Sequence, residues 1–323
     1  MDNIKTNNRI AAVPDGRSAV EVPPFAVPCM HCGQPSKACP NGALDEQDNT
    51  KAVWQALSSD KRVVAIVSPA VIEGVAAYYK EDSVDTVTGK LASVLFQMGF
   101  DRVLDQRVGT AACARAEGDL FVERIKADQP LPMLLPCSSH ARRFCVDFFP
   151  QLAAHLSTAV GAASLMGNIE KVVAENVFVV SIEPCTAEKT ICPSGIDAVL
   201  TTREIISMML ESGFSQLSSV QPAAFTPMLG EKTMTDGDRL YDVLHAACGL
   251  VDKGEATDAR IAYETQKDGK KIKAVTVFGL EEAKRILTDV QNGNHSYTII
   301  EICSCPGGCV HGDGQPTSVN SAR

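Results

Sequence analysis

Three closely spaced cysteines near the end of the chain are the residues best suited to chemistry. Cys303, Cys305 and Cys309 follow an apolar run that begins at Ile299, and their spacing is C-x-C-x3-C. Glycines surround the last cysteine, so the backbone can approach a bulky sulfur-bound group without clashes from Cβ atoms. The pattern favours an iron–sulfur ligand loop over the alternative, a strand ending in a glycine-rich turn with thiols present by chance.

Two further cysteines also follow predicted strands. Cys137 comes directly after the apolar run 131–136, and Cys185 directly after the run 177–184. In an open α/β sheet, ligands collect outside the carboxyl ends of the strands. We therefore expect these cysteines to converge with the C-terminal ones, and convergent thiolates suit an iron–sulfur cluster.

The elements that position these cysteines alternate along the chain. Continuous apolar runs predict buried strands, and apolar residues at helical spacing predict helices between them. The predicted strands are 63–67, 102–105, 131–136, 177–184, 196–200, 272–278 and a strand from 297. The predicted helices are 84–100, 111–128, 140–152, 202–213, 240–253 and 280–291. This alternation predicts an α/β fold with mostly parallel sheets flanked by helices.

Composition excludes several classes of protein. The 323 residues include twelve cysteines and carry a net charge of −9, with a mean hydropathy of +0.01. No run approaches the ~18 apolar residues of a membrane span, and residues 1–16 are too polar for a signal peptide. We therefore expect a cytoplasmic protein without membrane partners, whose cysteines serve metal or redox chemistry. The acidic balance argues against nucleic acid as a partner.

A second cysteine cluster lies near the N-terminus. Cys29, Cys32 and Cys39 match the ferredoxin run C-x2-C-x2-C-x3-C-P, with Pro35 in place of the third cysteine. Three thiolates can hold an additional iron–sulfur cluster if His31, water or an outside ligand completes the set. A vestigial site is the alternative.

Several motifs in order resemble the catalytic domain of [FeFe] hydrogenases. They are Pro132-Met133 before Cys137, Pro184-Cys185-Thr186, residues 196–204, Cys305-Pro306-Gly307-Gly308-Cys309 and Gly314-Gln315-Pro316. The resemblance implies two lobes with the cluster between them. It divides the chain into an N-terminal tail (1–28), a ferredoxin-like cysteine segment (29–50), a first lobe (51–175) and a second lobe (176–323) that carries the last cluster loop.

The resemblance also implies the cofactor, the H-cluster. In that family four cysteines hold a [4Fe-4S] cubane, and one of them bridges to a diiron subcluster with CO, cyanide and a bridging dithiolate. Carried over, Cys185 and Cys305 bind the cubane, and Cys309 bridges to the diiron unit. The remaining cofactor-binding positions implied by the motifs are Pro184, Ser138, Gly307, Gly308 and Gln315.

The first cysteine loop departs from the family pattern. The family has two adjacent cysteines, of which the first relays protons and the second binds the cubane, whereas here Cys137 is followed by Ser138. An alignment without gaps from Arg124 to Pro150 places Cys137 at the relay position and Ser138 at the ligand position. A shift of one residue makes Cys137 the ligand. We favour the shift, because a thiolate binds iron better than an alkoxide.

Other catalytic positions also differ. Glu188 stands where the family has a lysine that donates a hydrogen bond to a cyanide, and Lys189 is its neighbour. A carboxylate cannot donate that bond unless it is protonated. Cys303 replaces a methionine that packs near the diiron unit.

The expected proton chain is only partly retained. Glu117 and Ser157 match by count, whereas Leu120 replaces a second glutamate and cannot pass a proton. We expect an enzyme that interconverts H2 with protons and electrons, served by a ferredoxin-like electron carrier and by hydrogenase maturation proteins. The alternatives are a sensor of H2 or redox state with low turnover, and an iron–sulfur assembly protein without a diiron site.

Overall fold

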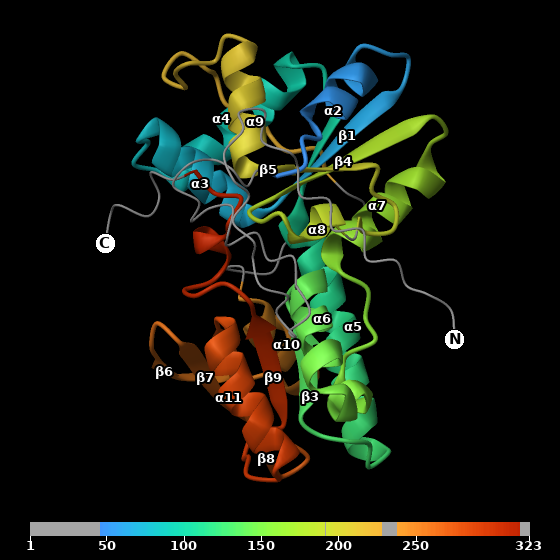
Figure 1. The fold of residues 1–323 in the computed structure, drawn as a ribbon, viewed down its shortest axis with the longest axis vertical. Helices are drawn as coiled ribbons and strands as arrows, with labels where there is room; N and C mark the ends of the chain where they lie inside the picture. The colour runs from blue at the N-terminus through green and yellow to red at the C-terminus, as the bar shows by residue number, and fades with distance from the viewer. Residues whose placement is uncertain (1–45, 191, 228–237, 317–323) are drawn as a thin grey trace, which may run out of the picture.

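The computed structural model describes residues 46–190, 192–227 and 238–316. Two sheets form the framework, one in the upper and one in the lower half of Figure 1. Helices cover both faces of each sheet, so the predicted α/β fold with mostly parallel sheets is confirmed. The N-terminal cysteines lie outside the described residues.

The upper sheet has four parallel strands. In spatial order they are β2 (Arg102–Asp105), β1 (Arg62–Val67), β4 (Val177–Glu183) and β5 (Ala198–Thr201). One face packs against α2 (Thr50–Leu57), α3 (Pro69–Tyr79), α4 (Val84–Gln97) and α9 (Thr202–Glu211). The other face packs against α7 (Ala162–Val173). Because both faces are covered, β1 reads as a continuous apolar run.

The lower sheet has five strands. In spatial order they are β3 (Met133–Pro136), β9 (Ile299–Cys303), β8 (Lys270–Phe278), β7 (Arg260–Lys267) and β6 (Asp252–Ala256). The first three are parallel, and the last two form antiparallel pairs. One face packs against α5 (Gln106–Lys126) and α10 (Arg239–Cys248), and the other against α6 (Ser139–Phe148) and α11 (Leu280–Gln291).

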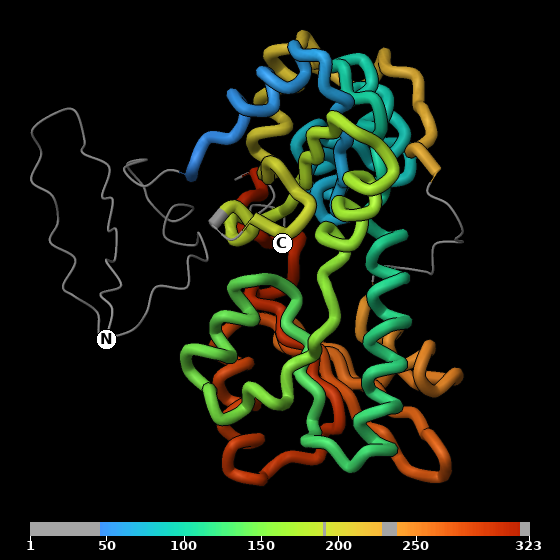
Figure 2. Tube along the Cα trace, turned by 90° about the vertical axis from the view of Figure 1, so that its right-hand side faces the viewer, coloured from blue at the N-terminus to red at the C-terminus, as the bar shows by residue number. Residues whose placement is uncertain are grey.

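The chain crosses between the sheets more than once. Strands β4 and β5 join β1 and β2, and β3 joins β9, while α5 descends from the upper half to the lower one (Figure 2). The expected boundary between residues 175 and 176 therefore does not coincide with the boundary between the sheets. Parallel strands need crossover connections, so a sheet can gather strands from distant parts of the chain.

Two predicted helices end at least four residues earlier than expected. The helix predicted over 140–152 ends at Phe148, and a short 3-10 helix begins at Pro150, because proline cannot donate the helical hydrogen bond. The helix predicted over 240–253 ends at Cys248, after which β6 begins. All five residues of β6 are exposed, so this edge strand carries no apolar pattern that the sequence could reveal.

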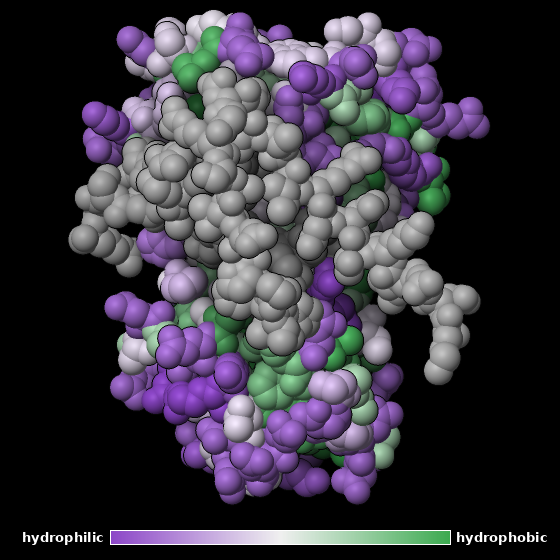
Figure 3. Space-filling view, viewed as in Figure 1, coloured by the Kyte–Doolittle hydropathy of each residue, from purple (hydrophilic) through white to green (hydrophobic). Residues whose placement is uncertain are grey.

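The carboxyl ends of the parallel strands face the middle of the molecule. Strands β3, β4 and β9 end there, next to the loops of Cys137, Cys185 and Cys305. On the face shown in Figure 3, hydrophilic residues predominate toward both ends of the molecule. In the described ranges, no helix is long and apolar enough to span a membrane.

Candidate metal centre

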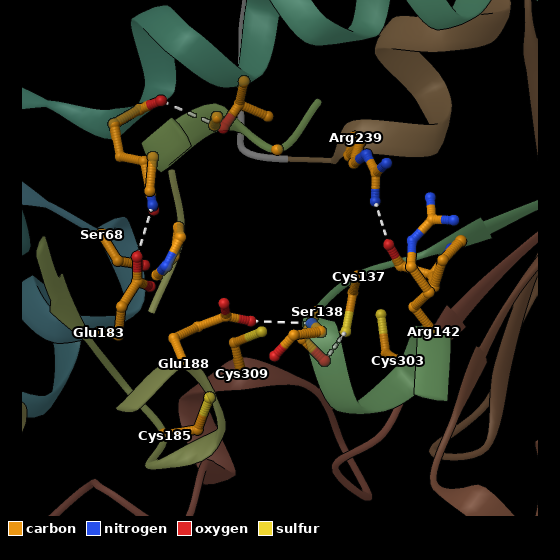
Figure 4. Close-up of a pocket in the computed structure, with 18 of the residues that line it drawn as sticks. Ser68, Cys137, Ser138, Arg142, Glu183, Cys185, Glu188, Arg239, Cys303 and Cys309 are labelled. Atoms are coloured by element: carbon orange, nitrogen blue, oxygen red, sulfur yellow. Dashed lines mark hydrogen bonds between the residues drawn. The ribbon is translucent and has the colours of Figure 1, made fainter. Parts of the chain in front are cut away.

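A cavity of about 370 Å³ lies where the two sheets meet. The upper sheet contributes Glu183 at the end of β4 and Ser68 after β1, and the lower sheet contributes Cys137 and Cys303. Figure 4 shows Glu183, Glu188 and Cys185 on one side, and Cys137, Cys303 and Arg239 on the other. The cavity therefore unites cysteine loops that are far apart in the sequence, as the strand ends predicted.

Among the cysteines that line the cavity, Cys137 interacts with both Cys303 and Cys309. Hydrogen bonds from the thiols of Cys303 and Cys309 hold the pKa of Cys137 well below the usual range, although burial acts in the opposite direction. The same contacts and burial raise the pKa of Cys303 and of Cys309. The direction of this shift favours the thiolate form of Cys137, and a thiolate is the form that binds iron.

Cys185 and Cys305 complete the group from the opposite side. Burial raises the pKa of Cys185 well above the usual value, and the neighbouring charges of Asp313 and Cys305 add to this effect. Cys185 and Cys305 in turn act on the thiol of Cys309. The predicted cubane ligands therefore line one cavity, in which Cys305 is buried, Cys137 and Cys185 are half-buried and Cys309 is exposed.

The cavity lining offers cysteine thiols, the ligands that iron–sulfur clusters take. Among the described residues, no group of three or more His, Cys, Asp or Glu side chains is arranged to hold a single metal ion. The loops that carry Cys185 and Cys309 pack against each other. Gly312 allows this packing, because an added Cβ would lie 2.2 Å from the carbonyl oxygen of Pro184. The loops of Cys309 and Cys185 can therefore lie in direct contact.

Ser138 has a structural role at the start of α6. Its Oγ accepts a hydrogen bond from the amide of Ala141 at 3.3 Å and caps the helix. The same oxygen lies 3.6 Å from Sγ of Cys137 and 3.4 Å from Nδ1 of His140. These contacts occupy the hydroxyl, which favours Cys137 over Ser138 as the ligand.

Glu188 and Lys189 point in different directions. Glu188 lines the cavity, accepts a 2.8 Å hydrogen bond from the amide of Ser139, and has its pKa raised by burial. Lys189 is only 3% exposed and forms ion pairs with Glu46 at 3.0 Å and Glu204 at 2.6 Å. Lys189 is not among the residues that line the described cavity.

Glu117 and Ser157 are in direct contact. The Ser157 hydroxyl donates to Oε1 of Glu117 at 3.2 Å. Arg239, which the sequence did not single out, donates to both oxygens of the same carboxylate at 2.5 Å and 3.0 Å. Because α10 packs against α5, this arginine reaches a residue 122 positions away, which no local pattern reveals.

Two buried carboxyl groups were also missed by the sequence reasoning. Burial raises the pKa of Glu183 to about 7 and that of Glu301 to about 7. The sequence offers one sign of them, because each is a charged residue inside an apolar strand. Such a residue is typically paired or functional.

The glycines and Gln315 shape the last loop. Gly307 and Gly308 have positive φ angles of 72° and 89°, which favour glycine and turn the chain between Cys305 and Cys309. Gln315 is 1% exposed and donates a 2.7 Å hydrogen bond to the carbonyl of Ala70. Gln315 therefore connects the last loop to α3.

Comparisons with known proteins agree with this arrangement. Residues 61–313 match the family model of the iron only hydrogenase large subunit, C-terminal domain. Iron hydrogenase 1 of Clostridium pasteurianum is 26% identical over 311 residues, which cover 86% of this chain and 54% of that protein. The cytosolic Fe-S cluster assembly factor narfl of Danio rerio is 26% identical over 308 residues, which cover 81% of this chain and 74% of that protein.

A solved structure of an [FeFe]-hydrogenase from Chlamydomonas reinhardtii superposes with a TM-score of 0.75. The match covers 85% of this chain and 86% of that one, at 22% sequence identity. At this identity the likeness establishes the fold. The chain spans about half the length of the Clostridium relative.

Proposed function

Because the chain belongs to the family of the iron only hydrogenase large subunit, C-terminal domain, we propose that it is an iron hydrogenase that interconverts H2 with protons and electrons. It would hold a [4Fe-4S] cubane bridged to a diiron subcluster with CO, cyanide and a bridging dithiolate. The observation that carries the proposal is the meeting of four loop thiols in one cavity, on Cys137, Cys185, Cys305 and Cys309.

The chain's own residues would serve this cofactor in distinct ways. When bound, the diiron unit supplies heterolytic cleavage and formation of H2. Cys137, Cys185 and Cys305 would hold the cubane, and Cys309 would hold both parts together. A protonated Glu188 can donate the hydrogen bond that a carboxylate cannot, and burial favours the protonated form.

The proposal extends to partners and location. A ferredoxin-like carrier would exchange the electrons, maturation proteins would supply the diiron unit, and Cys29, Cys32 and Cys39 would hold an additional iron–sulfur cluster on the electron path. A cytoplasmic location is supported by relatives named as cytosolic assembly components.

A second candidate is an iron–sulfur assembly protein or a low-turnover sensor. The cytosolic Fe-S cluster assembly factor narfl of Danio rerio and iron hydrogenase 1 of Clostridium pasteurianum are each 26% identical to this chain. Leu120 at a proton-chain position, and the ion pair of Glu117 with Arg239, also favour slow proton transfer.

One experiment separates these candidates. The full chain is reconstituted anaerobically with iron and sulfide, the synthetic diiron cofactor is added, and the infrared spectrum is recorded in the CO and cyanide region. Protein-bound bands that shift under H2 support the hydrogenase or the sensor, and turnover assays then separate those two. Cubane-loaded protein without such bands supports the assembly protein. Cys309→Ala is the matched control and should lose the bands while it retains most cubane iron.

A further inference from the structure

Arg239 occupies a position between three elements at the edge of the cavity. It is the first residue of α10, and its guanidinium reaches Glu117 on α5 and Glu301 on β9. Nη1 also donates to the carbonyl oxygen of Pro136, directly before Cys137, at 3.2 Å. Figure 4 shows Arg239 on the same side of the cavity as Cys137 and Cys303. One side chain thus links the strand end, the thiol loop and two carboxyl groups.

The contact with Glu117 leaves this carboxylate little capacity for further bonding. Nε and Nη2 of Arg239 donate to its two oxygens in a fork, and the Ser157 hydroxyl adds a third bond to Oε1. The Glu117 side chain is 2% exposed. A proton added to Glu117 would break the pair and leave the guanidinium without its best-placed countercharge, which is costly at a buried site.

The contact with Glu301 is much weaker. Nη1 of Arg239 lies 3.7 Å from Oε1, which is an ion pair without hydrogen-bond geometry, and Oε2 accepts one bond from the Thr276 hydroxyl at 2.9 Å. Arg239 and Thr276 offset the effect of burial only in part. Arg239 therefore forms hydrogen bonds with Glu117 but only a longer ion pair with Glu301.

We infer that Arg239 is a positioning residue that holds Glu117 in a closed ion pair, so that Glu117 does not exchange protons with the cavity and the Ser157–Glu117 route is interrupted. The inference concerns the proton path of the proposed function. It places the point of interruption at Arg239 on α10, a different helix from the one that carries Glu117.

The charged and titratable groups around the pair come from every neighbouring element. Cys113 on α5 and Cys137 after β3 act electrostatically on the pair, and Glu301 faces it from β9. Arg142 on α6 lines the same cavity and donates to the carbonyl oxygen of Ser157. Glu117 and Glu301 together outweigh burial and raise the pKa of Arg239, so the guanidinium stays charged.

Infrared spectroscopy of the cluster-free full chain tests the inference directly. A protonated carboxyl group gives a carbonyl stretching band that shifts in D2O, and a carboxylate does not. At neutral pH, Glu117→Gln should remove no such band from the wild-type spectrum. Arg239→Met should add a band, and the double variant Arg239→Met/Glu117→Gln should lack it. Glu301→Gln identifies the separate contribution of Glu301, and Glu123→Gln on the exposed side of α5 is the matched control.

Two results would overturn the inference. The first is loss of a protonated-carboxyl band in Glu117→Gln while Arg239 is present. The second is an Arg239→Met spectrum without a band that depends on Glu117. If Arg239→Met does not fold, the comparison of wild type with Glu117→Gln decides alone, and Arg239→Lys, which keeps the charge, should match wild type.

The measurement needs no diiron cofactor and no turnover. A chain that proves to be an assembly protein can therefore still show the closed pair, and a working hydrogenase can still lack it. Failure of the inference and failure of the proposed function are thus separate outcomes.

Discussion

The buried carboxyl groups on the two sides of the cavity have different kinds of partner. On the Cys137 wall, Arg239 pairs with Glu117, which lines the cavity, and with Glu301, which is not part of the lining. On the Cys185 wall, Glu183 accepts hydrogen bonds only from neutral groups, the Ser181 hydroxyl and the Gln106 amide, each at 2.7 Å. Among the described residues, no cation forms an ion pair with Glu183 or Glu188. One wall is ion-paired and the other is not.

This difference shows that contact geometry decides the state of a buried carboxyl group. Glu301 has a cation 3.7 Å away, yet its pKa is raised to about 7, as is that of Glu183, which has no cation. Of these three carboxyl groups, only Glu117 accepts two hydrogen bonds from one guanidinium. At 3.7 Å, Arg239 offsets the effect of burial on the pKa of Glu301 only in part, whereas it donates two hydrogen bonds to Glu117.

The largest expected effect concerns the thiol on the ion-paired wall. Cys137→Ser should abolish most cubane binding, because three thiolates and a hydroxyl hold iron poorly. Iron per chain after anaerobic reconstitution should fall from about four to below one, measured in a background with the three N-terminal cysteines changed to alanine. Cys303→Ser is the matched control and should keep its iron. Retention of iron by Cys137→Ser would make Cys137 the relay.

The next effect tests the strength of the ion pair. Arg239→Met leaves two buried carboxyl groups without their cation and should lower the free energy of unfolding by about 3 kcal/mol. Chemical denaturation of the cluster-free chain measures this loss. Arg143→Met, which removes a solvent-exposed pair with Asp147, should cost less than about 0.5 kcal/mol. Equal losses of unfolding free energy in the two variants would show that the buried ion pair stabilises the fold no more than the exposed one does.

The sequence predicted the thiol loops well, because their signals are local. Apolar runs such as 63–67 are buried on both faces and mark strands, and a cysteine that follows such a run must lie at the sheet's carboxyl edge. The same logic placed Cys137, Cys185 and Cys305 at one cavity.

The ion-paired wall could not be predicted, because it depends on tertiary packing. Arg239 meets Glu117 only since α10 packs on α5, and Lys189 turns away from the cavity only since Glu46 and Glu204 surround it. The spacing of residues along the chain cannot show which of two neighbours, such as Glu188 and Lys189, faces the cavity. The distribution of charge over the two walls is therefore a property of the folded chain.

The pH dependence of stability tests the raised pKa of Glu301. Its raised pKa means that the folded chain binds the proton more tightly than the unfolded chain does. This contribution is fully present below about pH 4.5 and is lost as the pH rises to about 7, with an amplitude on the order of 3 kcal/mol. Glu301→Gln should flatten the profile of unfolding free energy over this range. An unchanged slope would mean that Glu301 is ionised in the folded chain.

The smallest effect distinguishes a cap from a ligand. Ser138→Ala removes the hydroxyl that accepts the Ala141 amide at 3.3 Å, and should cost about 1 kcal/mol of stability. Ser83→Ala removes an equivalent cap of α4 with the same 3.3 Å bond, far along the chain from the cysteine loops, and should cost a similar amount. If Ser138 is only a cap, both variants bind as much iron as wild type after reconstitution. If iron falls in Ser138→Ala alone, the hydroxyl is a ligand, and Cys137 is then free to serve as the proton relay on the ion-paired wall.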